Sequence, residues 1–439
     1  MPRNGLVGAG IVMMLVWGFS TSGPFTSAFA AEAAAAGGSP KILDSAWKEI
    51  AAADPPEVRK EHSMVYDPAE DRILMAGEYW GTGDSMRTVT WQYEPRGERW
   101  VALDPADPPA ARIGPSIAYD PASRQTVLFG GLGFDGRTLG DTWIYDGIAN
   151  SWRNTTGSVS PSPRSGHTLV YSEQARVLVL FGGRTSFGEV VADTWHFDLA
   201  TMSWTSIAAS ASPPARSDYG AGYDPSIGKV VLFGGRNSTL DPLGDLWTYD
   251  PATRAWESVE PKGGPAARWG PSLVYHPKSE RMILFGGIGR MWEEMGFNDT
   301  WALDTHAQSW ERLETDSSPT HRFHQAMVYD PVRDRMVLFG GSTGGYSLIL
   351  GDTWTLEIVT AKAKPTPAPA RSSLAPISIL LVGTLIVAAS FVGARALARS
   401  ERRKAERSAE NQGPPEAMAL PAKVPRPARV RFSERGGEQ

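Results

Sequence analysis

The sequence contains no cysteine among its 439 residues. This absence excludes disulfide bonds, zinc–thiolate sites and thiol nucleophiles. It does not exclude export from the cytosol, because large secreted domains can fold without disulfides.

Positive charge is scarce through most of the chain and is concentrated near the C-terminus. From Arg395 onward there are 11 Lys or Arg and 6 Asp or Glu, so this segment carries a charge of +5. The rest of the chain carries about −10, which gives the net charge of −5. An acidic body argues against nucleic-acid binding. The sequence also lacks a nucleophile elbow, a phosphate-binding loop, a dinucleotide fingerprint and an HExxH motif. We therefore expect no nucleic-acid partner, cofactor or metal, and we identify no catalytic residue.

The N-terminus has the pattern of an export signal. Arg3 precedes an apolar stretch from Leu6 to Phe19, and small residues then lead to Ala28-Phe29-Ala30. This pattern predicts a signal peptide over residues 1–30, with cleavage after Ala30. An uncleaved anchor is the alternative, although about 14 apolar residues are short for a span.

A second apolar segment predicts a transmembrane helix near the other end. Residues 374–394 contain no charged side chain, and their 21 residues match a bilayer core of about 30 Å. A cluster of arginines follows directly, so the positive-inside rule places the tail, 395–439, in the cytoplasm. We expect this basic tail to be disordered. Residues 359–373 are rich in proline and alanine and predict a stalk. The expected location is the cell membrane, single-pass, with the preceding domain outside.

Glycine and tryptophan are abundant, with 46 and 16 copies, and both recur at intervals of 52–54 residues. A glycine pair follows an apolar run, as in VLFGG at Gly130-Gly131. An aspartate-containing triplet such as Asp141-Thr142-Trp143 comes ten to thirteen residues later, and a second tryptophan follows after nine more. Five copies are clear, and the first is degenerate, with Ala76-Gly77 and Val89-Thr90-Trp91. Each period predicts four short strands, the second of them covered on both faces.

This repeat resembles the kelch superfamily, in the D-T-W variant of galactose-oxidase-like propellers. The resemblance covers residues 43–358 and implies an all-β, six-bladed propeller. Galactose oxidase uses copper with a Tyr–Cys crosslink, which this cysteine-free chain cannot form, so the shared fold does not import that activity.

The sixth period lacks its fourth strand. The segment around Trp47 matches the fourth strand at Trp100, 53 residues later. We therefore expect the N-terminal strand to complete the last blade and close the ring, which removes an exposed sheet edge.

An arginine recurs where the chain enters each first strand, and it should meet the aspartate of the triplet near one mouth of the central channel. One interpretation is a structural Arg–Asp pair in each blade. The other is a cationic funnel for a carboxylate, an acidic glycan or an acidic peptide. Blade 1 has Val89 in place of the aspartate, so its arginine is expected to be the free one. The candidate ligand-binding arginines are Arg59, Arg112, Arg164, Arg216, Arg268 and Arg322.

The loops between second and third strands differ most among the copies. Trp80 and Trp292 fall outside the repeated tryptophan positions and are candidates for stacking on a sugar or contacting a protein. They could equally pack the channel mouth. His62, His167 and His324 lie near first-strand starts without metal-ligand spacing, which favours hydrogen-bonding roles.

These features predict a membrane-anchored, extracytoplasmic module that binds a protein, a peptide or a glycan. The alternative is an exported carbohydrate-active enzyme, such as an epimerase of a sialic-acid-like sugar. It would use the same arginines with a carboxylate such as Glu293 or Glu294, and substitution of Arg59 or Glu294 would test it. A signalling receptor that acts through the basic tail ranks last.

Overall fold

The computed structural model describes residues 39–77, 90–290, 296–344 and 348–361. All of them belong to one compact unit, Met1–Thr366, and the second unit, Pro367–Gln439, contains none. The expected signal peptide, transmembrane helix and tail lie outside the described residues, as does the stalk beyond residue 361. No helix able to span a membrane is found in the part of the chain that the structure describes.

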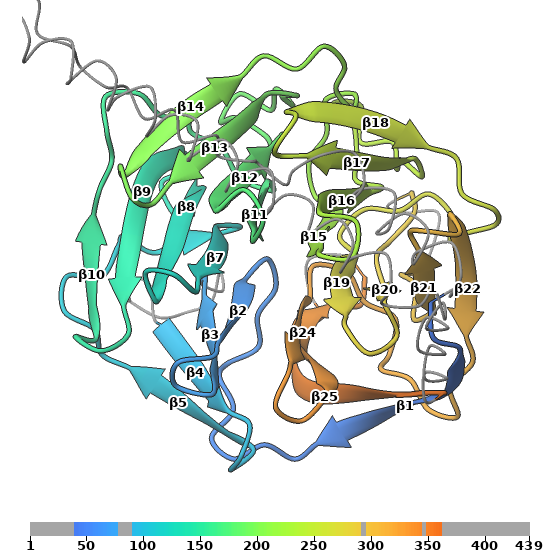
Figure 1. The fold of residues 1–439 in the computed structure, drawn as a ribbon. Helices are drawn as coiled ribbons and strands as arrows, with labels where there is room; N and C mark the ends of the chain where they lie inside the picture. The colour runs from blue at the N-terminus through green and yellow to red at the C-terminus, as the bar shows by residue number, and fades with distance from the viewer. Residues whose placement is uncertain (1–38, 78–89, 291–295, 345–347, 362–439) are drawn as a thin grey trace, which may run out of the picture. The chain divides into compact units, whose positions relative to one another are not determined.

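Within the described residues, twenty-five strands form six antiparallel sheets around a central axis (Figure 1). The first sheet contains β2 (Ser63–Asp67), β3 (Arg72–Ala76), β4 (Thr90–Glu94) and β5 (Arg99–Leu103). The second contains β7 (Ser116–Asp120), β8 (Gln125–Gly133), β9 (Thr138–Asp146) and β10 (Ser151–Asn154), with the short β6 (Arg112–Ile113) also paired to β8. The third contains β11 (Thr168–Ser172), β12 (Val177–Phe181), β13 (Thr194–Asp198) and β14 (Ser203–Ile207).

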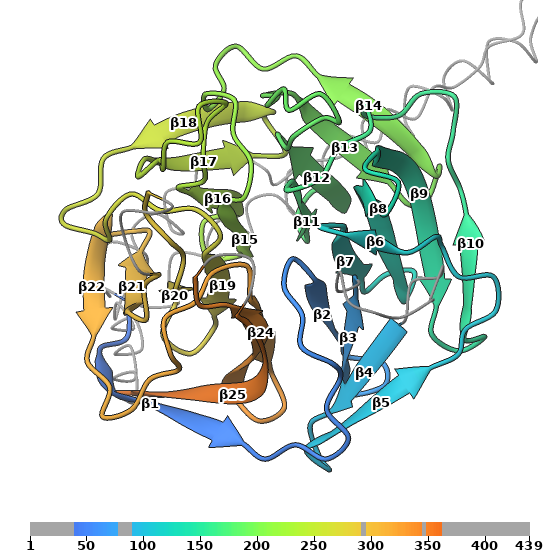
Figure 2. The ribbon, with the colours of Figure 1, turned by 180° about the vertical axis from the view of Figure 1, so that it is seen from behind.

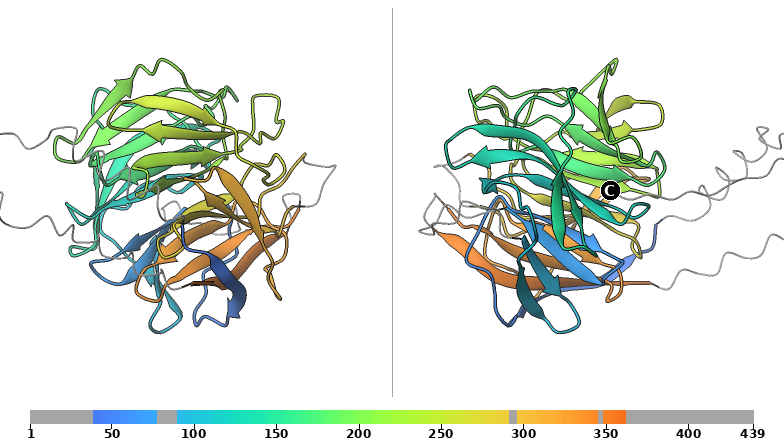
Figure 3. Two further views of the ribbon diagram at one scale, coloured as in Figure 1. Left: turned by 45° about the vertical axis from the view of Figure 1, so that its right-hand side comes forward. Right: turned by 90° about the vertical axis from the view of Figure 1, so that its left-hand side faces the viewer.

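The remaining three blades follow the same order. The fourth contains β15 (Gly220–Asp224), β16 (Lys229–Phe233), β17 (Leu246–Asp250) and β18 (Ala255–Val259). The fifth contains β19 (Ser272–His276), β20 (Arg281–Phe285), β21 (Thr300–Asp304) and β22 (Ser309–Leu313). The sixth contains β23 (Ala326–Asp330), β24 (Arg335–Ser342), β25 (Ile349–Thr360) and β1 (Ile42–Ile50). The reverse and side views show the blades following one another around the axis (Figures 2 and 3).

The N-terminal strand closes the ring, as the tryptophan spacing predicts. β1 pairs with β25 in antiparallel register, with Trp47 opposite Leu356. Figure 1 shows the blue β1 beside the orange β25 at the outer edge of the last blade. The six-bladed, all-β prediction is therefore confirmed.

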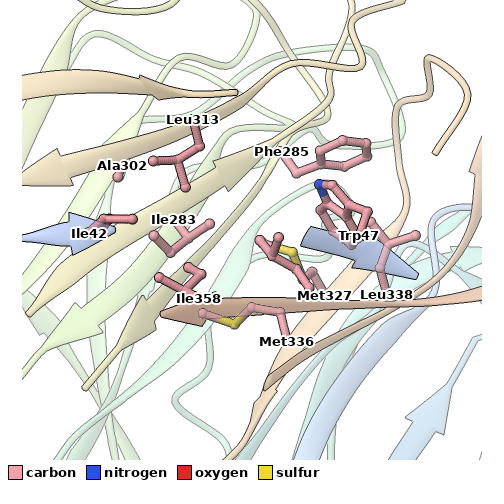
Figure 4. Packing of buried hydrophobic residues seen from close by; sticks show 11 residues of the cluster. Ile42, Trp47, Ile283, Phe285, Ala302, Leu313, Met327, Met336, Leu338 and Ile358 are labelled. Atoms are coloured by element: carbon pink, nitrogen blue, oxygen red, sulfur yellow. The ribbon is translucent and has the colours of Figure 1, made fainter. Parts of the chain in front are cut away.

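Hydrophobic side chains fill the space between neighbouring blades. The second strands are buried on both faces, as in β20 and β24, which agrees with their continuous apolar sequences. At the closing blade Trp47 packs on Phe285 of blade 5, with ring centroids 4.7 Å apart, beside Met327 and Leu338 (Figure 4). Burial of one such tryptophan is worth about 3–5 kcal/mol relative to alanine.

The glycine pairs allow the blades to approach each other closely. Gly130 has φ of +66°, and a Cβ placed on it would lie 2.6 Å from the carbonyl oxygen of Arg164 in the next blade. The following residue, Gly131, donates its N–H to that same oxygen at 2.8 Å. Any side chain at the first glycine would therefore separate two blades.

Candidate functional site

The repeated arginines are buried inside their own blades. Each donates Nε to the carbonyl two residues earlier and Nη1 to the carbonyl of a glycine 18 residues later. In blades 2 to 6 the two terminal nitrogens also bind both carboxylate oxygens of the triplet aspartate, at 2.6–3.0 Å. The five pairs are Arg112–Asp141, Arg164–Asp193, Arg216–Asp245, Arg268–Asp299 and Arg322–Asp352.

The carboxylates of these pairs are also bound by tryptophan. In blade 3 the indole Nε1 of Trp195 donates to Asp193 Oδ2 at 2.7 Å. Burial raises the pKa of Asp193, but the hydrogen bonds and charge of Arg164 outweigh burial, so the net pKa lies below its usual value. The Arg164 side chain is 0% exposed, so a ligand in the channel would meet other side chains. This geometry is the one expected of structural Arg–Asp pairs.

The structure contradicts the expectation that Arg59 is a free arginine. It is buried, and it donates Nη1 to the Gly77 carbonyl at 3.2 Å and Nε to the Glu57 carbonyl at 3.1 Å. Its guanidinium carbon lies 5.7 Å from the ring centre of Trp91. The expectation is wrong because backbone carbonyls and an aromatic face hold the guanidinium of blade 1.

The other candidate residues lie in segments beyond the description. Trp80, Trp292 and Glu294 fall in residues 78–89 and 291–295. Their roles stay predictions.

A central channel of about 1060 Å³ runs between the six inner strands, β2, β7, β11, β15, β19 and β23. One end is ringed by tyrosines near the ends of these strands, such as Tyr66 and Tyr223. The other end lies where the chain enters the strands. We call this end the channel mouth, formed by Lys60, Glu61, Arg184, Asp218, Arg236 and His324.

A belt of backbone hydrogen bonds surrounds the channel mouth. Two residues after each repeated arginine the backbone has positive φ, and in blades 2, 3 and 5 this residue is glycine. Blades 1, 4 and 6 instead have Glu61, Asp218 and His324, with φ of 56–57°. Non-glycine residues seldom adopt this conformation. Five of these N–H groups donate to the carbonyl of the equivalent residue in the preceding blade at 2.6–3.0 Å, for example from Glu61 to the His324 carbonyl.

The three side chains at these positions form one buried ion-pair cluster. His324 Nδ1 lies 3.2 Å from Glu61 Oε1, and Nε2 lies 3.3 Å from Asp218 Oδ1. Burial lowers the pKa of His324, but the two carboxylates outweigh burial and raise it above 6.5. Burial raises the pKa of Glu61, yet the charge of His324 brings it below its usual value. The imidazole therefore lies between two carboxylates, one near each of its nitrogens, which favour its protonated form.

Two further cations extend the cluster. Arg236 Nε binds Asp218 Oδ2 at 2.6 Å, and its guanidinium carbon lies 4.2 Å from the ring centre of Trp269. Lys60 Nζ lies 3.8 Å from Glu61 Oε1. Sequence reasoning missed this cluster. Two features of the sequence could have indicated it. Glu61, Asp218 and His324 stand where the other blades have glycine, and Arg184 and Arg236 directly follow two of the glycine pairs.

His62 and His167 join neighbouring blades rather than lining a metal site. Each packs edge-on against the phenylalanine that precedes the glycine pair in the second strand of the preceding blade, Phe339 and Phe129. Burial, helped by the adjacent repeated arginine, lowers the pKa of each histidine to about 3, so both are neutral. Among the described residues no group of three or more His, Asp or Glu has an arrangement that could hold a metal ion.

Apolar side chains are exposed at the tips of the turns between second and third strands. These turns and the channel mouth emerge on one face, the loop face, because both precede strands that run in the same direction. Phe187 is 98% exposed at the tip of the turn 185–189, which is closed by N–H groups of Thr185 and Gly188. The turns of blades 2, 4 and 6 expose Phe134, Leu240 and Leu348.

Comparisons with known proteins agree with this architecture. Residues 126–343 match the model of the Attractin/LZTR1 beta-propeller family. The chain is 30% identical over 270 residues to the human multiple epidermal growth factor-like domains protein 8, which is 57% of this chain and 9% of that protein. It is 31% identical over 235 residues to an F-box/kelch-repeat protein of Arabidopsis thaliana, covering 49% of this chain and 48% of the relative.

A third relative is matched over more of its own length. Bovine kelch domain-containing protein 3 is 25% identical over 279 residues, which is 59% of this chain and 70% of the relative. The chain thus spans about a tenth of the human relative and about half of the plant relative. The likeness to galactose-oxidase-like propellers stays a prediction. The six four-stranded blades and these matches together show a kelch-type six-bladed β-propeller.

Proposed function

We propose that this propeller is a protein-binding module that docks its partner on the loop face. The observation that carries the proposal is the exposure of Phe187, Phe134 and Leu240 on closed turns of three successive blades. Exposed aromatic residues on a rigid scaffold are characteristic of binding sites, because they supply large contact areas at little entropic cost.

The turns that carry these residues are preorganised. In blade 2 the N–H of Arg137 donates to Asp135 Oδ1 at 3.1 Å, and in blade 4 the N–H of Asp241 donates to Asn237 Oδ1 at 2.9 Å. Neighbouring turns are also connected, since Ser186 Oγ accepts a hydrogen bond from the N–H of Thr138 at 2.8 Å. These turns are therefore ordered before a partner binds, so binding loses little conformational entropy.

We further propose that the module is extracytoplasmic and anchored by the segment 374–394. The support is the export signal over residues 1–30 and the arginine cluster after the apolar segment. The cysteine-free chain allows a direct test. A single cysteine at Ile148, which is 80% exposed, should react with a membrane-impermeant maleimide on intact cells. A cysteine at Ser408 should react only after permeabilisation, and the reverse pattern would refute this placement.

The enzyme alternative has less support. The repeated arginines that it would use are buried inside their blades, Arg59 among them. At the channel mouth each nitrogen of His324 faces a carboxylate at 3.2–3.3 Å, and its side chain is only 8% exposed, which disfavours proton exchange with a substrate.

The binding proposal is tested by comparing the two faces of the propeller. The full-length protein, solubilised in detergent, would capture partners from membranes of the cells that express it. Phe187→Ser on the loop face should abolish or strongly reduce capture of the main partner. Ile148→Ser is the matched control, because Ile148 is exposed in the turn between the third and fourth strands, on the opposite face. Equal capture by both variants, or loss only with Ile148→Ser, would refute docking on the loop face.

A further inference from the structure

Three side chains at the channel mouth lie across three glycines of the backbone belt. The six belt positions, in blade order, are Glu61, Gly114, Gly166, Asp218, Gly270 and His324. A Cβ placed on Gly270 would lie 2.9 Å from His324 Cδ2, and one on Gly166 would lie 2.7 Å from Asp218 Oδ1. A Cβ on Gly114 would lie 3.8 Å from Glu61 Oε2. The side chains of blades 1, 4 and 6 therefore use the room left by the glycines of blades 2, 3 and 5, and they narrow the entrance to the channel.

His324 holds this cover together. Its Nδ1 lies 3.2 Å from Glu61 Oε1, and its Nε2 lies 3.3 Å from Asp218 Oδ1. Its ring also packs against the rings of Trp269 and Phe323, with centroids 5.1 and 5.2 Å away. A protonated imidazole donates from both nitrogens, whereas a neutral one has a single donor and a single acceptor. Loss of the proton therefore leaves one of the two carboxylates facing a lone pair.

Glu61 is the less firmly held of the two carboxylates. Asp218 keeps two other partners, because Arg236 Nε and Ser217 Oγ donate to its Oδ2 at 2.6 and 2.8 Å. In the described part of the chain, the one cation besides His324 near the Glu61 carboxylate is Lys60, at 3.8 Å. The Glu61 side chain is 27% exposed, whereas that of Asp218 is 9% exposed. Glu61 is therefore the carboxylate that moves when the imidazole becomes neutral.

We propose that Glu61 is a pH-dependent gate at the channel mouth. Bound to the protonated His324, it covers the entrance beside Gly114. When the imidazole loses its proton, the Glu61 side chain turns toward solvent and widens the entrance. The gate uses none of the turn-tip residues of the proposed protein-binding face, so either proposal can fail alone.

The charge of His324 sets the pH at which the gate opens. Burial lowers the pKa of His324, but the two carboxylates outweigh burial and hold it above 6.5. The other charged side chains of the mouth are Lys60, Arg184 and Arg236, and the nearest contacts of Lys60 and Arg236 are with the carboxylates. The gate therefore opens on the alkaline side of pH 6.5.

The cysteine-free chain allows one thiol to report on the gate. Ser165 lies beside it, since the Cβ placed on Gly114 would be 3.5 Å from Ser165 Cβ. The full-length Ser165→Cys protein is treated with a bulky maleimide and, separately, with the small reagent iodoacetamide. The ratio of the two rates cancels the thiolate fraction and reports access alone. This ratio should rise severalfold between pH 6 and pH 8.5.

A second substitution separates the gate from other effects of pH. Glu61→Gly removes the side chain and suits the positive φ at this position, so the ratio should be high at both pH values. Val231→Cys, in place of Ser165→Cys, puts the thiol in a fully buried position of β16, and it should stay unreactive in both backgrounds if the fold is kept. A ratio at Ser165→Cys that does not change with pH would overturn the proposal, as would a rise that persists undiminished with Glu61→Gly.

Discussion

The indole Nε1 of Trp47 donates a hydrogen bond to Thr300 Oγ1 at 2.9 Å, which joins the N-terminal strand to blade 5 across 253 residues. The same contact recurs between other neighbouring blades, for example from Trp204 to Thr142 and from Trp256 to Thr194. Each bond connects the outer strand of one blade to the third strand of the blade before it. The ring is therefore held by repeated polar contacts as well as by its apolar core.

Thr300→Val should weaken this closure. Valine keeps the shape of threonine but leaves the buried Trp47 Nε1 without an acceptor, which costs about 1–3 kcal/mol. Urea unfolding measures the loss. In a Trp47→Phe background the same substitution should cost little, and a full additive cost there would contradict the assigned hydrogen bond.

One interface shows the natural counterpart of this variant. Leu246 stands where the other triplets have threonine, and Trp310 Nε1 has no hydrogen-bond partner in the described part of the chain. The contact between blades 4 and 5 therefore relies on apolar packing of Trp310 against residues such as Phe233.

Asp299→Asn should destabilise the protein by about 3–5 kcal/mol, because it leaves the charge of Arg268 buried without a carboxylate. Equilibrium unfolding measures the change. Glu257→Gln is the control, since this carboxylate pairs with Lys229 at the exposed outer strand and should cost no more than about 0.5 kcal/mol. A similar small cost for both variants would contradict a structural role for the Arg–Asp pairs.

His324 should give the protein a loss of stability at alkaline pH. Its folded pKa is raised above 6.5, so its contribution is complete below about pH 6.5 and is lost as pH rises through the folded pKa. The pKa values of Glu61 and Asp218 are lowered, so the stability that these two carboxylates contribute is lost only in acid. The stability difference between wild type and His324→Gln should therefore be largest just below about pH 6.5 and shrink toward both alkaline and strongly acidic pH. A difference that is independent of pH would contradict the ion-pair cluster.

His62 and His167 should give the opposite response. Their folded pKa values are about 3, so the unfolded chain binds more protons below about pH 6.5. Each histidine should then reduce stability by up to about 1.4 kcal/mol per pH unit as the pH falls toward 3.

Blade 6 suggests the variant that tests this response. Gln325 stands at the equivalent position and donates Nε2 to the Phe285 carbonyl at 2.9 Å. His62→Gln/His167→Gln should therefore keep stability at pH 7.5 and lose much of the acid sensitivity in thermal unfolding. An unchanged acid profile would show that other groups cause it.

The repeat made the ring predictable, whereas the channel mouth was not. Trp47 could be assigned to the last blade because its spacing to Trp100 equals one period. The arginines and aspartates could be paired for the same reason. Glu61, Asp218 and His324 occupy a position at which the repeat varies, and only the closed ring brings blades 1, 4 and 6 together. A repeated pattern predicts the contacts that all blades share. Contacts between residues at variable positions depend on how the closed ring brings the blades together.

The central claim is that the partner docks on the loop face. The most direct measurement is hydrogen–deuterium exchange of the full-length protein with and without the captured partner. The account predicts slower exchange in the turns 133–137, 185–189 and 237–241. It predicts no change in the turns between first and second strands, such as 120–125, on the opposite face. Protection confined to those opposite turns, or no protection of the three loop-face turns, would contradict it.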